Sequence, residues 1–194
     1  MSKAKHHLEH IILKNSPKAV KEQKIIVAVS GGADSMGLLK ALLQTFPPHN
    51  LVAAYFHHGD HLNKEYRHKA QELIKEVSKK YGVIFETEKS QNPLVSESEC
   101  RVARNRFLAQ TAMKHNTSVV AFAHHLDDWL ETQLIKMIRG CSFQSLHQKM
   151  ILAKDNSLGV LKWRPWIEIE RLQIKEYVIE DKIEFIDDPS NETL

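Results

Sequence analysis

The segment Ser30–Ser35, with the sequence "SGGADS", combines residue types that bind phosphate groups. It lies between an apolar, β-branched run and a segment whose apolar residues recur at helical spacing, which indicates a strand, a turn and a helix. Glycines let the backbone approach a ligand, and N–H groups at a helix start attract an anion. The hydroxyls of Ser30 and Ser35 add two donors. The segment therefore predicts a phosphate-binding loop, and the alternative is a plain turn between strand and helix.

This loop lacks the features of two common nucleotide motifs. A Walker loop requires G-x-x-x-x-G-K-[ST], and the dinucleotide fingerprint requires spaced glycines rather than the adjacent Gly31 and Gly32. Asp34 is also unexpected in an anion-binding turn, unless a cation lies between its carboxylate and the phosphate.

A second group of polar residues begins at His124-His125 and continues through Asp127, Asp128 and Glu131. On a helix, residues three and four apart are neighbours, so these three carboxylates are expected to share one side of the first turns. Such a cluster could hold a metal ion or the ammonium group of an amine substrate. The alternative is an ordinary acidic helix start with a solvated face.

Two further groups carry weaker signals. Arg101 and Arg104 are one helical turn apart and could bind phosphates or a carboxylate, or could form a solvated basic face. In "HHGDH", the residues His58, Asp60 and His61 match part of a metallohydrolase motif, but Phe56 occupies the position of its first histidine. A zinc site there is a chemical alternative that lacks its leading ligand.

Apolar runs and amphipathic segments alternate along the chain. We expect strands over 24–30, 51–58, 83–88 and 117–125, helices over 35–46, 64–82, 96–115 and 126–140, then a strand or hairpin within 157–170, a helix over 169–182 and a terminal loop. This order predicts an α/β fold with a doubly wound, mainly parallel sheet. Ligands of such sheets bind beyond the carboxyl ends of the strands, where the polar residues are concentrated.

The composition is that of an ordinary globular domain. The 194 residues include 42% hydrophobic and 26% charged residues, with a formal net charge of +3. We expect one domain over 1–194, with an N-terminal extension over 1–23 and a C-terminal appendage over 157–194. Apolar runs are too short for a membrane span and the N-terminus has no signal core, so we expect a cytoplasmic protein. Cys100 and Cys141 do not form a CxxC pair, which argues against a disulfide framework or zinc site.

Several motifs resemble one family. "SGGADS" matches the SGGxDS signature of the PP-loop ATP pyrophosphatases, and "AHHLDDWLETQLIKMIRG" is similar to the AHHxDDxxET…RG signature of the tRNA(Ile)-lysidine synthetases. "ESECRVAR" at 97–104 resembles that family's E-x-x-x-R-x-x-R helix, "HHG" at 57–59 its N/D-H-G turn, "RPW" at 164–166 its RPL element, and "DDPSN" at 187–191 its DPSN element. The resemblance covers roughly residues 24–191.

The resemblance implies a Rossmann-like three-layer sandwich of the adenine nucleotide alpha hydrolase type and a defined reaction. ATP would adenylate the C2 oxygen of the wobble cytidine in the tRNA(Ile) with a CAU anticodon, and L-lysine would then displace AMP to form lysidine. The implied ATP-binding residues are Ser30, Gly31, Gly32, Ala33, Asp34, Ser35, His58 and Arg139. Asp34 would hold Mg2+, the catalytic residues would be Asp34, His124, Asp128 and Glu131, and the substrate-binding residues would be Arg101, Arg104, Asp127, Asp128 and Glu131.

The sequence also departs from this family. Cys141 to Leu146 replace a glycine-containing turn, Asp60-His61 replace Leu-Arg, and Asn105 replaces an aromatic residue. We also expect the family's C-terminal tRNA-binding domains to be absent. The alternatives are a truncated or degenerate homologue that binds ATP without modifying tRNA, a tRNA thiolase of the same superfamily, and an ATP-dependent amide ligase. A dimer is possible, although the sequence does not define the oligomeric state.

The two cysteines test the thiolase alternative, because those enzymes usually depend on paired catalytic cysteines or a cluster site. A variant with both Cys100→Ser and Cys141→Ser should keep full ATP-dependent activity with its substrate. Turnover rates of this variant and the natural chain would be compared under reducing conditions, and a loss of turnover in a folded variant would favour the thiolase.

Overall fold

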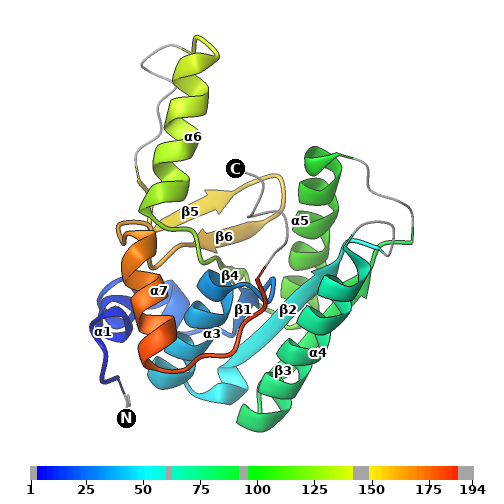
Figure 1. Cartoon of the computed structure of the whole chain (residues 1–194), viewed down its shortest axis with the longest axis vertical. Helices are drawn as coiled ribbons and strands as arrows, with labels where there is room; N and C mark the ends of the chain where they lie inside the picture. The colour runs from blue at the N-terminus through cyan, green and yellow to red at the C-terminus, as the bar shows by residue number, and fades with distance from the viewer. Residues whose placement is uncertain (1–3, 60–62, 92–95, 142–148, 188–194) are drawn as a thin grey trace.

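The computed structural model describes residues 4–59, 63–91, 96–141 and 149–187. Within them, six strands form one sheet in the order β3-β2-β1-β4-β6-β5 (Figure 1). Five strands are parallel, and β5 pairs antiparallel with β6 at one edge. The strands are β1 (Ile25–Ala28), β2 (Leu51–His57), β3 (Ile84–Lys89), β4 (Val119–Ala121), β5 (Leu152–Asp155) and β6 (Val160–Trp163).

The central strands are apolar on both faces. All seven residues of β2 are buried, as are Ile25, Ile26 and Val27 of β1. A parallel sheet lies between two layers of helices, so its central strands contain continuous apolar runs rather than alternating ones. The expected mainly parallel sheet is therefore confirmed.

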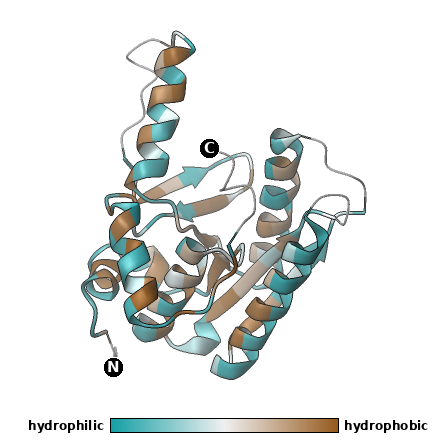
Figure 2. Ribbon diagram, viewed as in Figure 1, coloured by the Kyte–Doolittle hydropathy of each residue, from teal (hydrophilic) through white to brown (hydrophobic). Residues whose placement is uncertain are grey.

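Helices cover both faces of this sheet. On one face α1 (His7–Lys14), α3 (Ala33–Thr45), α4 (Lys64–Tyr81) and α7 (Arg171–Glu180) enclose the larger apolar core. On the other face α5 (Glu97–Lys114) packs Phe107 and Leu108 against Phe56 and Phe122. Figure 2 shows brown along β2 and on parts of the helices that pack against the sheet, and teal at the ends of β5 and β6. This arrangement confirms the doubly wound, three-layer fold.

The strand order reverses beside β1. The chain passes from β1 to β2 and β3 on one side of the sheet, and then crosses to β4 on the other side. In register, Ile25 lies beside both Leu51 and Val119. A crevice at the carboxyl ends of β1 and β4 follows from this topology. The loops that leave these two strands are Ser30–Ser35 and the His124–Asp128 segment.

Residues assigned to an N-terminal extension form two helices, α1 and α2 (Lys18–Lys21). Leu8, Ile12 and Val20 are fully buried in the same core as β1. The indole Nε1 of Trp163 donates to the carbonyl of Asn15 at 2.8 Å, and that of Trp166 donates to the carbonyl of Leu8 at 3.3 Å. These contacts join the N-terminal helices to the tail of the chain.

The end of β4 and the tail differ in detail from the sequence expectation. β4 ends at Ala121 rather than near 125, so both histidines of "AHH" lie in the following loop. Of the strand or hairpin expected within 157–170, the strand β6 lies in that range, whereas its hairpin partner β5 lies wholly before it, over Leu152–Asp155. Asp155 stabilises the turn because its Oδ1 accepts from the backbone of Ser157 and Leu158 at 3.1 and 3.2 Å.

One helix stands apart from the sheet. The helix α6 (Leu126–Ile138) projects beyond the carboxyl edge of the strands, and brown segments continue along its exposed length (Figures 1 and 2). Leu134, Met137 and Ile138 are 57%, 58% and 85% exposed, so they contribute little to the core. Across the described residues, no helix combines the length and apolar character that a membrane span requires.

A buried polar contact between α1 and α7 gives a stability prediction. The hydroxyl of Tyr177 donates to Glu9 Oε1 at 2.9 Å, and both residues are buried. Tyr177→Phe should lower the free energy of unfolding by about 1–3 kcal/mol, because a buried carboxylate loses a donor. Urea denaturation measures this, with Tyr81→Phe on the exposed end of α4 as the control, expected to change stability by less than about 0.5 kcal/mol. Equal effects in the two variants would contradict the assignment.

Candidate active site

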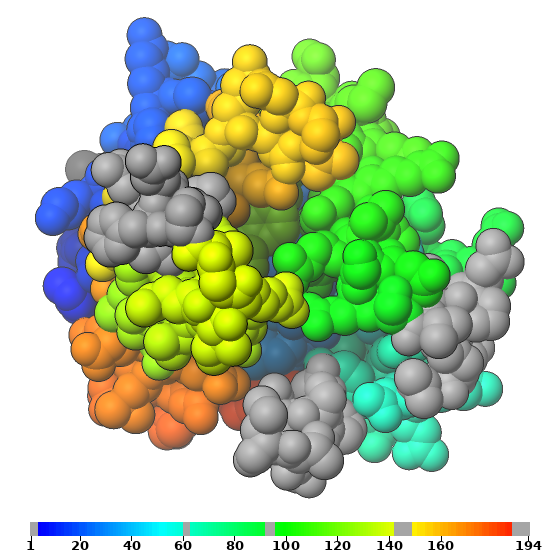
Figure 3. Space-filling model, turned by 90° about the horizontal axis from the view of Figure 1, so that it is seen from above, coloured from blue at the N-terminus to red at the C-terminus, as the bar shows by residue number. Residues whose placement is uncertain are grey.

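A cavity of about 420 Å³ opens at the predicted crevice. Three loops contribute to its walls, namely those that follow β1, β2 and β4, together with residues of α4 and α5. Figure 3 shows a hollow between α6 and α5, with blue atoms at its floor. Seven residues predicted for the site line the cavity: Ser30, Asp34, Ser35, His58, Arg104, His124 and Asp128.

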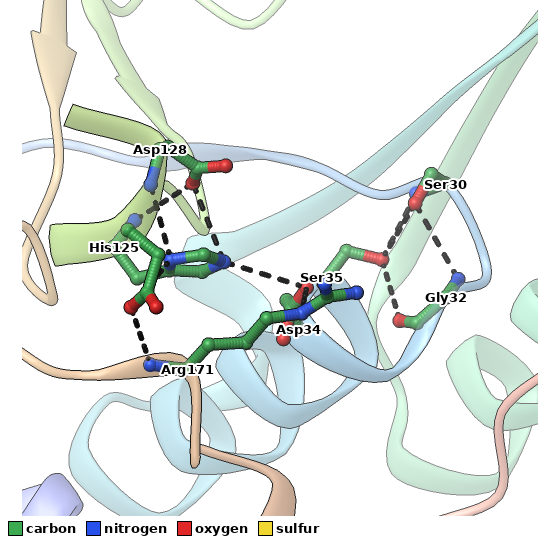
Figure 4. A network of polar contacts seen from close by, with 8 residues as sticks. Ser30, Gly32, Asp34, Ser35, His125, Asp128 and Arg171 are labelled. Atoms are coloured by element: carbon green, nitrogen blue, oxygen red, sulfur yellow. Dashed lines mark hydrogen bonds and ion pairs between the residues drawn. The ribbon is translucent and has the colours of Figure 1, made fainter. Parts of the chain in front are cut away.

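The loop after β1 is held in shape by two hydroxyls. The Oγ atoms of Ser30 and Ser35 lie 3.1 Å apart, Ser35 Oγ accepts from the backbone N–H of Ser30 at 3.1 Å, and it donates to the carbonyl of Gly32 at 3.0 Å (Figure 4). Gly32 is the N-cap of α3 and provides no side-chain cap. Among the described residues, no N-cap side chain occupies the N–H groups of the first turn, and their binding of an anion stays a prediction.

Gly31 requires its lack of a side chain. Its φ is +91°, a conformation that L-residues with a Cβ rarely adopt, and a Cβ placed there would lie 2.7 Å from Cβ of Ala70 on α4. The carbonyl of Gly31 also accepts from the backbone N–H of Ile186 at 2.9 Å. The loop is thus fixed between α4 and the tail.

The surroundings of the Asp34 carboxylate are suited to a bound cation. Within the described part of the chain its Oδ1 is buried and has no hydrogen-bond partner, while Oδ2 lies 3.7 Å from His125 Nε2 and 3.9 Å from Arg171 Nε. Among those same residues, no group of three His, Cys, Asp or Glu could hold a metal ion by itself. One carboxylate completed by phosphates and water is a common site for Mg2+. The residues present therefore fit a nucleotide-bound Mg2+.

His125 connects this loop to α6 and α7. It is 4% exposed and caps α6, with Nδ1 accepting from the N–H of Asp128 and Asp128 Oδ2 accepting from the N–H of His125 (Figure 4). Burial alone would lower the pKa of His125, but the nearby carboxylates of Asp34, Asp128 and Asp127 raise that pKa above its ordinary value. His125 thereby holds Asp34 beside the start of α6.

His124 lies in the cavity in a different environment. Its ring stacks on Phe122 with centroids 5.4 Å apart and planes 9° apart, and its Nδ1 accepts from Arg164 Nε at 3.3 Å. Burial lowers the pKa of His124 to about 4, and the charges of Arg164 and Arg104 act in the same direction against that of Asp128. Near neutral pH the ring is therefore uncharged and carries one proton that it can donate.

The two arginines of α5 are separated by the structure. Arg104 lines the cavity, and burial followed by the charge of Arg101 lowers the pKa of its guanidinium. Its Nε is buried and lacks a hydrogen-bond partner among the described residues. Arg101 is exposed and pairs with Glu97 at 3.2 Å, outside the cavity lining. The geometry therefore favours Arg104 as the residue that contacts an anionic ligand.

The three carboxylates of α6 do not form the expected cluster. Asp128 lines the cavity, whereas Asp127 Oδ2 accepts from the N–H of Arg171 at 2.8 Å and stabilises the start of α7. That hydrogen bond lowers the pKa of Asp127. Glu131 on α6 and Arg139, the C-cap of that helix, are exposed and lie outside the described cavity lining. Asp127 and Asp128 diverge because consecutive positions on a helix face different directions and because α7 binds Asp127.

Of the metallohydrolase-like motif, His58 lies in the cavity wall and its ring contacts Phe56 edge-on with centroids 5.1 Å apart. Asp60 and His61 lie outside the described residues, as do residues 188–191 of "DDPSN". Among the site predictions, Ala33 is on α3 outside the lining, next to the N-cap Gly32.

Sequence reasoning assigned no separate role to three residues of this site. They are His125, Arg164 and Arg171, which hold Asp34, His124 and Asp127 respectively. For His125 a signal existed, because a polar residue three positions before Asp128 resembles a capping box. Arg164 and Arg171 reach the site from segments about 40 residues further along the chain, and local spacing could not reveal their contacts.

Comparison with known families agrees with this geometry. The family model described as a PP-loop domain matches residues 2–194, so the chain belongs to the PP-loop domain family. The tRNA(Ile)-lysidine synthase of Bdellovibrio bacteriovorus is 36% identical over 100% of this chain and 60% of that protein. The enzyme of the same name from Nostoc sp. is 29% identical over 89% of this chain and 50% of that protein. The chain thus spans about 60% or less of these two relatives.

Solved structures support the fold. The U34-tRNA thiolase NcsA from Methanococcus maripaludis, solved with its [4Fe-4S] cluster, has a TM-score of 0.77 at 16% identity, covering 94% of this chain and 65% of that one. The NMN synthetase from Francisella tularensis has a TM-score of 0.58 at 14% identity, covering 96% and 74%. At such identities the likeness concerns the arrangement of the sheet and helices alone.

The two loop glycines provide a matched test of the phosphate loop. Gly31→Ala should destabilise the protein by about 1–3 kcal/mol, because it combines a positive φ with a contact to Ala70. Gly32→Ala should change stability by no more than about 1 kcal/mol, since its φ is −75° and a Cβ added there would lie 3.6 Å from Ser30 Oγ. Thermal unfolding compares the pair, and an equal or larger effect at Gly32 would refute this account of the loop.

Proposed function

We propose that this chain carries out ATP-dependent ligation of L-lysine to C2 of the wobble cytidine in the tRNA(Ile) with a CAU anticodon, which forms lysidine. The observation that carries this proposal is the cavity in which the "SGGADS" loop, His124 and Asp128 lie together. The two relatives described above bear the name of that activity, one of them aligned over the whole of this chain. A cytoplasmic location follows from a tRNA substrate and stays a prediction.

In the first step, the cytidine C2 oxygen would attack the α-phosphorus of ATP and pyrophosphate would leave. The N–H groups at the start of α3 and the hydroxyls of Ser30 and Ser35 would bind the phosphate oxygens. Asp34 would hold Mg2+ through its buried Oδ1. Bound there, the ion would neutralise charge that develops on the pyrophosphate.

The uncharged ring of His124 would donate a hydrogen bond to an oxygen that gains negative charge. Arg104 on α5, whose Nε has no partner among the described residues, would bind a phosphate or the lysine carboxylate in the same cavity. Ser30 and Arg104 therefore belong to two walls of one anion-binding cavity.

In the second step, the lysine amine would attack C2, lose a proton and displace AMP. Asp128 faces the cavity and would accept that proton. Glu131 lies one turn further along α6 and is exposed, so it would bind the lysine ammonium only near the cavity mouth. The two carboxylates therefore have distinct expected roles, one in the chemical step and one in binding.

A transfer assay tests the function. The chain is incubated with ATP, Mg2+, labelled lysine and tRNA(Ile) with a CAU anticodon, and label in RNA and released pyrophosphate are measured. Asp128→Asn should lower kcat by at least about 100-fold, because it removes a proton acceptor. Glu131→Gln should raise KM for lysine and leave kcat nearly unchanged. Glu76→Gln, on the exposed side of α4, serves as the matched control.

The outcomes separate the alternatives. Pyrophosphate release that depends on tRNA, together with label in RNA, supports the ligase. ATP binding without tRNA-dependent release identifies a nucleotide-binding homologue instead. A KM for lysine that is unchanged in Glu131→Gln removes the proposed role of that residue.

A further inference from the structure

A half-buried arginine contacts the cavity histidine from a segment that the reaction described above does not use. Arg164 follows β6, and its Nε–H donates to Nδ1 of His124 at 3.3 Å. The two residues are 40 positions apart in sequence. Among the described residues, the His124 ring makes this one hydrogen bond with a protein group. Arg164 forms no ion pair with a carboxylate of those residues.

The chemistry of arginine fixes the direction of this hydrogen bond. A guanidinium has only N–H donors and stays protonated in proteins, so it cannot accept a hydrogen bond. Nδ1 of His124 must therefore be the acceptor, without a proton of its own. In an uncharged imidazole the single proton then resides on Nε2.

A stacking contact fixes the ring itself. Phe122 stacks on His124 with an interplanar angle of 9°, which sets the plane of the ring. The charges of Asp128 on α6 and Arg104 on α5 have opposite effects on the pKa of this ring, and both residues line the cavity. Arg164 and Arg104 together oppose protonation of Nδ1, while Asp128 alone would favour it.

Arg164 is itself held rigidly. Its backbone N–H donates to the carbonyl of Ile151 at 2.7 Å, and its carbonyl accepts from the N–H of Ile167 at 3.3 Å. It is flanked by Trp163 and Trp166, both with 0% exposure and both hydrogen-bonded to backbone carbonyls in or next to α1. Because folding already fixes the backbone of Arg164, the contact with His124 costs only the rotamer entropy of the Arg164 side chain.

We infer that Arg164 is a positioning residue that holds the proton of His124 on Nε2, so that the ring can donate to an anionic oxygen in the cavity. The same contact prevents the other tautomer, in which Nδ1 carries the proton and Nε2 could only accept. The use of this proton in lysine transfer rests on the proposed function. The tautomer itself is a property of the protein without substrate.

The tautomer can be measured directly. Two-bond 1H–15N correlation spectra of the 15N-labelled, substrate-free chain near pH 7 distinguish Nε2–H, Nδ1–H and doubly protonated rings. Because the chain has 12 histidines, His124→Gln identifies the signals of this ring. The natural chain should show His124 uncharged, with Nδ1 unprotonated.

Two substitutions separate charge from hydrogen bonding. Arg164→Met removes both, so the ring should show mixed tautomers and take up a proton at higher pH. Arg164→Lys keeps a positive charge but not the planar Nε–H, so the ring should stay uncharged while its tautomers mix. In transfer assays both should lower kcat by roughly 10- to 100-fold, as is typical for loss of an orienting partner, with KM for ATP nearly constant. Arg106→Met, an exposed arginine on α5, is the control.

The inference is overturned if the natural chain carries the proton on Nδ1 or both protons near pH 7, or if Arg164→Met leaves the tautomer unchanged. Should Arg164→Met fail to fold, the natural chain and Arg164→Lys still decide the question. Absence of lysine transfer in the natural chain would count against the proposed function alone, because the spectra require neither ATP nor tRNA.

Discussion

Three helix N-termini meet at one edge of the sheet, and each carries a positive partial charge. The structure of the site depends on the groups that compensate these charges. α3, α6 and α7 all begin there, and the first N–H groups of each helix have no acceptor within the helix, which leaves a positive dipole end. The imidazole of His125 lies between them, within 3.7 Å of Asp34 on α3 and capping α6, while Asp127 accepts from the start of α7. Asp127 and Asp128, both in the first turn of α6, thus compensate the starts of α6 and α7.

The start of α3 is compensated differently. Its N-cap is a glycine, and its one acidic side chain turns Oδ2 toward His125 and Arg171. The first-turn N–H groups of α3 can therefore bind a negative ligand atom, and the buried Oδ1 of Asp34 can bind a positive one. A polyphosphate with its metal ion has that combination of charges. The loop lacks the lysine of a Walker motif, and the fixed positive charge beside Asp34 comes instead from the guanidinium of Arg171, which another segment supplies.

Much of this arrangement was accessible from the sequence. Alternating apolar and amphipathic segments predicted the parallel sheet, and strand order explains why loops near 30, 58 and 124 converge. Ser30, Asp34 and His124 could be predicted for the site because each follows a strand with a strong apolar signal. The divergence of Asp127 from Asp128 depends on α7, whose docking no local pattern encodes. Arg164 was equally inaccessible, since its contact arises only when β6 pairs with β4.

The contact between α1 and α7 also constrains how the chain reaches this structure. Glu9 and Tyr177 are 168 positions apart, and the buried carboxylate obtains its hydroxyl donor only from the far end of the domain. Trp163 and Trp166 likewise reach back to carbonyls near residues 15 and 8. During synthesis from the N-terminus, α1 would remain without these partners until nearly the whole domain had emerged. Closure of the fold, and with it the anchoring of Arg164, is thus a late and long-range event in folding.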